Sequence, residues 1–278
     1  MQSPRRLSKS GVRLALAGAA IALAAGVLPA TQASATADGK HGDPAVKPTI
    51  VLVHGAWADG SSWNRVVSRL QHDGYTVRVP PNPLRGVAGD SAYLASYLKT
   101  VPGPVVLVGH SYGGFLITNA ATGNTDVKAL VYVDAYIPAQ DDTLNGLTAQ
   151  FPGSHVTPDA LDFVPSADSV VDAYLKPTKF HDIMANDLPA RQTATIAAAQ
   201  RPLAASTLDE PSGAPAWKTI PSWDVIGTAD HAVPAAAQEF MAKRAGATVT
   251  KVRASHLSMI SHPATVKDVI EDAARHTS

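Results

Sequence analysis

A serine flanked by glycines stands between a strand pattern and a helix pattern. Residues 109–114 read Gly-His-Ser-Tyr-Gly-Gly, with Ser111 at the centre of a G-x-S-x-G spacing. Residues 105–108 are β-branched and apolar, as in a strand buried on both faces, and residues 115–121 continue as a helix. A serine in such a cramped strand-to-helix turn presents its hydroxyl to solvent. The pattern therefore favours a nucleophilic Ser111 over an incidental serine in a glycine-rich turn.

A serine hydroxyl is a weak nucleophile at neutral pH, so it needs a base and an orienting acid. Asp230 lies in the loop between a predicted strand at 223–227 and a predicted helix at 235–244, which Pro234 precedes. His256 follows a predicted strand at 247–252 and precedes a helix that starts near Pro263. We therefore predict Asp230 as the acid and His256 as the general base.

Acyl transfer also needs donors for the oxyanion. Residues 49–53 form another buried-type strand and lead into His-Gly-Ala-Trp at 54–57. The backbone N–H groups of Ala56 and of Tyr112, the residue after the nucleophile, are the predicted donors. His54 is interpreted as a brace for this loop.

Several other residues compete for these roles. Asp134 follows the apolar strand 129–133 and is the alternative acid. His231 adjoins Asp230 and is too constrained to reach the serine. His262 ends the loop before Pro263, and His110, inside the glycine-rich turn, is expected to pack behind the serine.

Four segments together resemble the small α/β-hydrolase esterases, in the branch that includes plant methyl esterases and hydroxynitrile lyases. They are residues 54–57, 109–114, 230–234 and 255–259, and their order gives the Ser…Asp…His sequence of that fold. The resemblance spans about residues 48–276. It implies an α/β fold with a doubly wound, mostly parallel sheet of about six strands, helices on both faces, a small helical cap, no cofactor and no metal ion.

Between Pro138 and Trp223 the alternation of strands and helices lapses. We interpret residues from about 138 to 215 as the cap, with helical stretches near 167–175 and 188–200. Apolar residues at helical spacing usually serve a core, but some of them can line a pocket. The candidate lining residues are Trp57, Tyr136, Phe151, Tyr174, Phe180, His181, Met184 and Leu257.

The first 35 residues have the pattern of a secretory signal. A basic start is followed by an apolar stretch at 14–28 and by Ala-Ser-Ala at 33–35. The pair Arg5-Arg6 also fits a twin-arginine signal, and a retained membrane anchor is the alternative. We expect a secreted protein without stable membrane insertion after cleavage, a flexible segment at 36–47, and a hydrolase domain at 48–278.

Composition limits the partners. The chain has 278 residues and no cysteine, which excludes disulfides and thiolate catalysis. Residues 1–35 hold four of the 23 basic residues and none of the 23 acidic ones, so the remainder has a formal charge of −4. This mildly acidic balance gives no electrostatic reason to bind nucleic acid. It leaves the oligomeric state open.

The sequence thus predicts a secreted serine esterase that cleaves small carboxylic esters through an acyl-enzyme. Lactonase, amidase and hydroxynitrile lyase activities use the same fold, and so does a non-catalytic ligand-binding protein. Hydroxynitrile lyases of this family carry a threonine and a lysine where this chain has Gly55 and Leu257, which favours hydrolysis. A dinucleotide-dependent reductase is disfavoured because residues 54–60 lack the G-x-G-x-x-G spacing.

Overall fold

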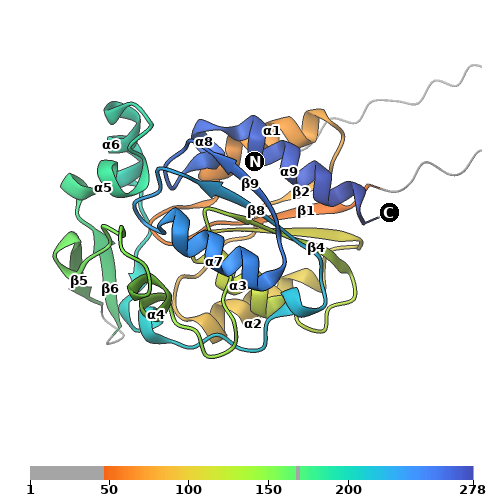
Figure 1. Ribbon diagram of the computed structural model, residues 1–278, viewed down its shortest axis with the longest axis horizontal. Coiled ribbons are helices and arrows are strands. Elements are labelled where there is room, and N and C mark those ends of the chain that lie inside the picture. Colours follow the sequence, from red (N-terminus) through yellow and green to blue (C-terminus); the bar gives the residue numbers. More distant parts are fainter. Residues whose placement is uncertain (1–46, 167–169, 278) are drawn as a thin grey trace, which may run out of the picture. The chain divides into compact units, whose positions relative to one another are not determined.

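Six strands form one parallel sheet in the computed structural model, which describes residues 47–166 and 170–277. Its strands run in the order β2-β1-β3-β4-β8-β9, and every neighbouring pair is parallel (Figure 1). Their bounds are β1 Thr49–Val53, β2 Val77–Arg78, β3 Val105–His110, β4 Val127–Val133, β8 Ser222–Gly227 and β9 Thr248–Val252. The predicted signal at 1–35 and segment 36–46 lie outside the described residues.

Helices cover both faces of this sheet. One face carries α1 (Asn64–His72) and α9 (Pro263–Arg275), and the other carries α2 (Val87–Leu98), α3 (Gly113–Ala120) and α7 (Ala235–Ala245) (Figure 1). Since both faces are covered, β3 and β8 are buried along their whole length, which explains the apolar run at residues 105–108 of β3. In the described part of the chain, no helix combines the length and apolar character needed to cross a membrane.

The order of the strands determines where a site can form. The chain runs from β1 outward to β2 and then returns to β3 on the other side of β1, so the two crossovers pass over opposite faces. In open parallel sheets, the crevice at such a reversal lies beyond the carboxyl ends of the strands. The loops after β1 and β3, which hold residues 54–57 and Ser111, end at this reversal. The doubly wound α/β fold is confirmed.

The chain between β4 and β8 forms the cap, which lies beyond the carboxyl ends of the strands, on the left in Figure 1. It contains α4 (Leu144–Ala149), α5 (Pro177–Met184), α6 (Ala190–Ala198) and several 3₁₀ turns. It also contains a three-stranded antiparallel sheet of β5 (Leu161–Pro165), β6 (Val171–Leu175) and β7 (Leu203–Ala204).

One predicted cap helix is wrong. The stretch near 188–200 contains α6, but residues 171–175 form the strand β6 instead of a helix. Val171 pairs with Pro165 of β5, and the Gln200 side chain bonds both the N–H and the carbonyl of Leu175 at 3.0 and 2.9 Å. The strand is therefore fixed by pairing with distant residues, which a local helical pattern does not reveal.

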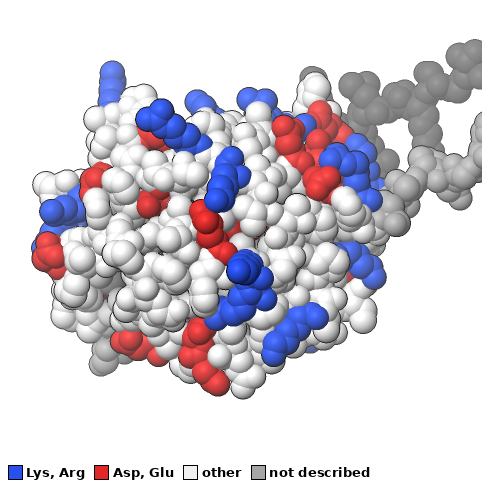
Figure 2. All heavy atoms as spheres, in the orientation of Figure 1, with Lys and Arg blue, Asp and Glu red and all other residues white. Residues whose placement is uncertain are grey.

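Charged side chains are mixed over the surface. On the face shown in Figure 2, the acidic and basic side chains are interspersed, and no continuous basic stripe crosses this face. This distribution agrees with the near-neutral composition.

Candidate active site

Ser111 lies in the turn between β3 and α3. Its φ of +54° is in the left-handed region that non-glycine residues rarely adopt. The turn is so tight that a Cβ on Gly109 would lie 2.6 Å from the carbonyl oxygen of Gly113. The sequence motif therefore forms the strained strand-to-helix turn predicted for it.

Ser111 is the first member of a chain of hydrogen bonds. Its Oγ lies 2.8 Å from Nε2 of His256, whose Nδ1 lies 2.8 Å from Oδ2 of Asp230. The His256 and Asp230 side chains are 1% and 0% exposed. The loops after β3, β8 and β9 thus bring together three residues that are far apart in the sequence.

The partners of His256 define its protonation. Burial lowers the pKa of His256 to about 3, so its imidazole is neutral at neutral pH. Nδ1–H then donates to the Asp230 carboxylate, and Nε2 accepts from the Ser111 hydroxyl. This is the tautomer in which Nε2 can take a proton from the serine.

Asp230 is held by three further donors. Its Oδ1 accepts from the N–H groups of Ala232 and Val233 at 2.7 and 2.9 Å, and its Oδ2 accepts from Gln238 Nε2 at 2.8 Å. Burial raises the pKa of Asp230, and these bonds oppose the rise because they stabilise the ionised carboxylate. Gln238 was not predicted, since a polar residue inside a helix pattern carries no signal of a buried partner.

The alternative acid, Asp134, is engaged elsewhere. Its Oδ1 accepts from the N–H of Gly227 at 2.9 Å, and its Oδ2 accepts from the N–H and the hydroxyl of Ser258 at 3.0 and 2.5 Å. Gly227 ends the strand before Asp230, and Ser258 lies two residues after His256. Asp134 therefore ties together the two loops that carry the acid and the base.

Two other histidines act as braces. His110 is fully buried, and its Nε2 bonds the backbone carbonyl of His256 at 2.8 Å. The Nδ1 of His54 bonds the Gly55 carbonyl at 2.9 Å, while its Nε2 accepts from the N–H of Asn82 at 3.3 Å. Burial lowers the pKa of both imidazoles. These hydrogen bonds join His110 to the loop of His256, and His54 to Gly55 and Asn82, contacts that suit bracing residues.

The remaining two candidate histidines bond away from Ser111. His262 Nδ1 lies 2.9 Å from the Ser261 hydroxyl, between α8 (Ser258–Ser261) and α9. His231 Nδ1 faces Asp182 of the cap. Among the described histidines, His256 alone has a ring nitrogen bonded to Ser111.

The predicted oxyanion donors are free to bind a ligand. Among the described residues, no acceptor is bonded to the N–H of Ala56 or of Tyr112. Both residues line the same cavity as Ser111. A Cβ on Gly55 would lie 2.6 Å from Ser111 Cβ, so the glycine lets this loop approach the serine closely.

The cavity at Ser111 is small, with a volume of about 40 Å³. Trp57 and Tyr136 line it, as predicted, and Trp57 Nε1 also bonds the carbonyl of Ala173 in the cap at 2.9 Å. Most of its other walls were not predicted and come from α4, the rest of the cap and the Asp230 loop: Leu144, Asn145, Thr148, Val156, Leu203, Leu208, Ala232 and Val233.

Six predicted lining residues do not line this cavity. Three of them are half-buried, and the other three lie in the core, where apolar residues usually serve packing. The ring of Phe151 lies tilted against that of Phe240, with 5.3 Å between ring centroids, and His181 Nε2 bonds the Leu188 carbonyl at 3.1 Å. Tyr174 lies half-buried on β6, and three are fully buried: Phe180, Met184 and Leu257.

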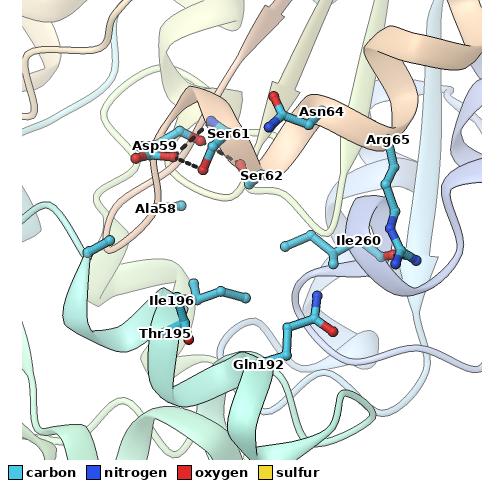
Figure 3. Close-up of a pocket in the computed structure, with 11 residues that line it drawn as sticks. Ala58, Asp59, Ser61, Ser62, Asn64, Arg65, Gln192, Thr195, Ile196 and Ile260 are labelled. Carbon is cyan, nitrogen blue, oxygen red and sulfur yellow. Dashed lines mark hydrogen bonds between the residues drawn. The ribbon is translucent and has the colours of Figure 1, made fainter.

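A larger cavity, of about 270 Å³, opens between α6 and the start of α1 (Figure 3). Asp59 lines it, but its carboxylate accepts from the N–H and hydroxyl of Ser61 and so caps the turn at Gly60–Trp63. Ser111, His256 and Asp230 do not line this larger cavity. We therefore place the candidate active site in the smaller cavity.

The chain is similar to known proteins in sequence and in fold. The chain matches the model of the alpha/beta hydrolase family over residues 50–269. It is 34% identical over 110 residues to the carbendazim hydrolyzing esterase of Nocardioides sp. (strain SG-4G), covering 35% of this chain and 46% of that protein. It is 32% identical over 133 residues to a pyrethroid hydrolase of Sphingobium wenxiniae, covering 43% and 47%. Both matches span less than half of the relative's length.

A solved structure of polyneuridine aldehyde esterase superposes with a TM-score of 0.69 at 19% identity, covering 82% of this chain and 99% of the other. An open parallel sheet with a serine in the turn after β3, and with an acid and a histidine after later strands, defines the α/β-hydrolase class. The family model covers most of the chain, and the chain belongs to the alpha/beta hydrolase family. The resemblance to its small esterases is confirmed.

The hydrogen bonds of Asp134 to Gly227 and Ser258 give a prediction about the stability of the protein. In Asp134→Asn, an amide NH₂ group replaces one carboxylate oxygen and faces the N–H of Gly227 or of Ser258. That buried N–H loses its acceptor, which lowers the free energy of unfolding by roughly 1–3 kcal/mol. Ser258→Ala removes only the hydroxyl bond and costs about 1 kcal/mol. Urea unfolding at pH 7 measures both, with Asp268→Asn, whose side chain is 68% exposed, as the control. A larger loss for Ser258→Ala than for Asp134→Asn would contradict the tie.

Proposed function

We propose that this protein is a serine esterase that cleaves small carboxylic esters by way of an acyl-enzyme. The observation that carries the proposal is the chain of two 2.8 Å hydrogen bonds from Ser111 through His256 to Asp230. Family membership and the esterases among its relatives support the same reaction class.

In the first half-reaction, Ser111 Oγ attacks the ester carbonyl while its proton passes to His256 Nε2. Asp230 stabilises the imidazolium that forms, and the N–H groups of Ala56 and Tyr112 bind the oxyanion. The imidazolium then protonates the leaving alcohol. In the second half-reaction, His256 takes a proton from water, whose oxygen attacks the acyl carbon. The bond between the acyl carbon and Ser111 Oγ then breaks, His256 returns the proton to Ser111 Oγ, and the acid is released.

The size of the cavity supports a short acyl group. About 40 Å³ beside Ser111 holds an acyl group of a few heavy atoms, while Leu144, Val156, Leu203 and Leu208 close it from the cap side. Longer acyl chains would have to displace these side chains. Binding energy spent on that displacement lowers kcat/KM.

The two positions that distinguish lyases from hydrolases support hydrolysis. A threonine at position 55 would place its Cβ 2.6 Å from Ser111 Cβ and 2.8 Å from the His110 carbonyl. Position 257 holds a fully buried leucine, which offers no cationic group. A non-catalytic binding role is disfavoured, because it does not need a neutral, buried His256 bonded to Ser111. Lactones and amides need the same groups and form the comparison substrates for the test below.

Activity against p-nitrophenyl esters tests the proposal. We expect kcat/KM to be highest for the acetate and to fall at least about tenfold for the octanoate, because the cavity is closed. Ser111→Ala should lower kcat by at least about 10³-fold with an unchanged melting temperature. Ser68→Ala, at an exposed serine on α1, is the control. Retained wild-type hydrolysis in Ser111→Ala would overturn the mechanism, and a maximum at the octanoate would overturn the short-acyl preference.

The protonation of His256 predicts the pH profile. The imidazole is an active base only when neutral, so activity falls as the pH drops through its pKa. Burial lowers that pKa to about 3 from 6.5, so the acid limb of kcat/KM should lie well below pH 6.5. The protein also loses stability as the pH falls, because its buried neutral histidines take up protons more readily when the chain is unfolded. Melting temperatures measured at each pH separate this acid unfolding from the acid limb of kcat/KM. A midpoint at or above pH 6.5 would contradict the assignment.

We also propose that the chain is exported through the signal pattern at residues 1–35. In a secreting bacterial host, the protein recovered from the medium should start after Ala35, as read by N-terminal sequencing. Replacing both Arg5 and Arg6 by Lys should block export only if the twin-arginine route is used. Retention of the uncleaved chain in the cell would contradict the proposal.

A further inference from the structure

Two histidines and an aspartate from three separate segments meet on the surface of the cap. His155 lies in the loop after α4, Asp182 lies on α5, and His231 lies in the loop after β8, next to Asp230. His155 Nδ1 is 2.6 Å from Asp182 Oδ2, and His231 Nδ1 is 3.1 Å from Asp182 Oδ1. One ligand atom from each residue lies within 4.8 Å of the others. The esterase mechanism uses none of these three side chains.

The chemistry of these groups fits a transition-metal ion. Imidazole nitrogen together with a carboxylate oxygen is a ligand set for Zn²⁺ and related ions, which bind three protein ligands and leave a position for water. With metal–ligand bonds of about 2.0–2.1 Å, tetrahedral ligand atoms lie about 3.3 Å apart. The distance of 3.1 Å between His231 Nδ1 and Asp182 Oδ1 is close to this value, and the distance of 2.6 Å between His155 Nδ1 and Asp182 Oδ2 is shorter than it. Small shifts of these side chains would therefore let a metal ion replace the protons of the two imidazole–carboxylate hydrogen bonds.

The backbone already holds the three residues together. The N–H of His155 donates to the carbonyl of His231 at 2.8 Å, and the two imidazole centroids are 4.3 Å apart. Asn186 Nδ2 donates to the carbonyls of Asp182 and Ala229 at 3.1 and 3.0 Å, joining α5 to the same loop. Because these bonds fix the segments, binding an ion would require little ordering of the chain.

The cluster is open to solvent. The side chains of His155, Asp182 and His231 are 47%, 51% and 36% exposed, so an ion can enter and water can complete its coordination. Lys179 lines the adjoining surface hollow of about 230 Å³ and adds a positive charge that opposes cations. Affinity must then come from the imidazoles, which favours Zn²⁺ over Mg²⁺, an ion that prefers oxygen ligands.

We propose that His155, Asp182 and His231 form a binding site for one divalent transition-metal ion of the zinc type. The bound ion would join the cap, through the loop after α4 and through α5, to the loop that carries Asp230. Because it binds the folded protein, it would also raise the melting temperature. The site does not depend on the esterase function, and its test measures binding.

Calorimetric titration of Zn²⁺ into the purified, EDTA-treated, tag-free protein at pH 7.5 tests the site. We expect one ion per chain, and His155→Ala and His231→Ala should each weaken its binding at least about tenfold. His72→Ala is the matched control, since His72 is an exposed histidine 3.1 Å from Asp73. Its binding should equal that of the wild type, and Mg²⁺ should not compete at equal concentration. Absence of stoichiometric Zn²⁺ binding, or undiminished binding in a His155→Ala/His231→Ala double variant, would overturn the site.

A spectroscopic measurement guards against misfolded variants. Co²⁺ in a site with few ligands and a low coordination number absorbs in the visible range, so the titration can be repeated with Co²⁺ as the probe. Asp182→Asn keeps the shape of the side chain and removes its charge, and circular dichroism reports whether it is folded. A folded Asp182→Asn protein should lose Co²⁺ affinity at least about tenfold. An unchanged affinity would show that Asp182 is not a ligand and would overturn the three-residue site.

Discussion

The desolvated hydrogen bond between His256 and Asp230 is the interaction on which the site depends. An imidazole buried in this way is kept neutral, and the bond from its Nδ1–H leaves Nε2 as an acceptor facing Ser111. Burial raises the pKa of Asp230, and the N–H groups of Ala232, Val233 and Gln238 oppose this rise by replacing part of the water that the carboxylate has lost. The fold must therefore supply a rigid loop on each side of this bond.

Parallel strands and Asp134 supply that rigidity. The loops after β8 and β9 end at the same edge of the sheet, and Asp134 bonds both of them through Gly227 and Ser258. His110 adds a third connection, from the strand before the serine to the backbone of His256. Buried polar bonds from the carboxyl ends of β3 and β4 thus fix the positions of Asp230 and His256.

The cap closes the cavity beyond the carboxyl ends of the strands and thereby limits the volume beside Ser111. Trp57 connects the loop after β1 to β6 through the Ala173 carbonyl, while the loop of Asp230 contacts the cap at His155 and Asp182. A larger substrate would have to displace the cap, and a metal ion at His155 would strengthen the contact between the cap and the loop of Asp230.

The parallel sheet, the turn at Ser111 and the pairing of His256 with Asp230 could be predicted, because each has a local pattern and the strand ends meet at one edge. The strand β6 could not, since it is fixed by β5 and by Gln200. The walls of the cavity were also missed: Leu144, Leu203 and Leu208 reach Ser111 only through the folding of the cap. Phe180 and Met184 have the same apolar character but lie in the core. Local spacing does not distinguish these two environments.

The rate at which a fluorophosphonate labels the protein tests the central claim most directly, because the reagent reacts with an activated serine and needs no substrate pocket beyond it. Intact-mass and peptide analysis should find one label, on Ser111, and the second-order rate should fall at least about 100-fold in His256→Ala. Equal rates in wild type and His256→Ala, or a label on another residue, would contradict the account.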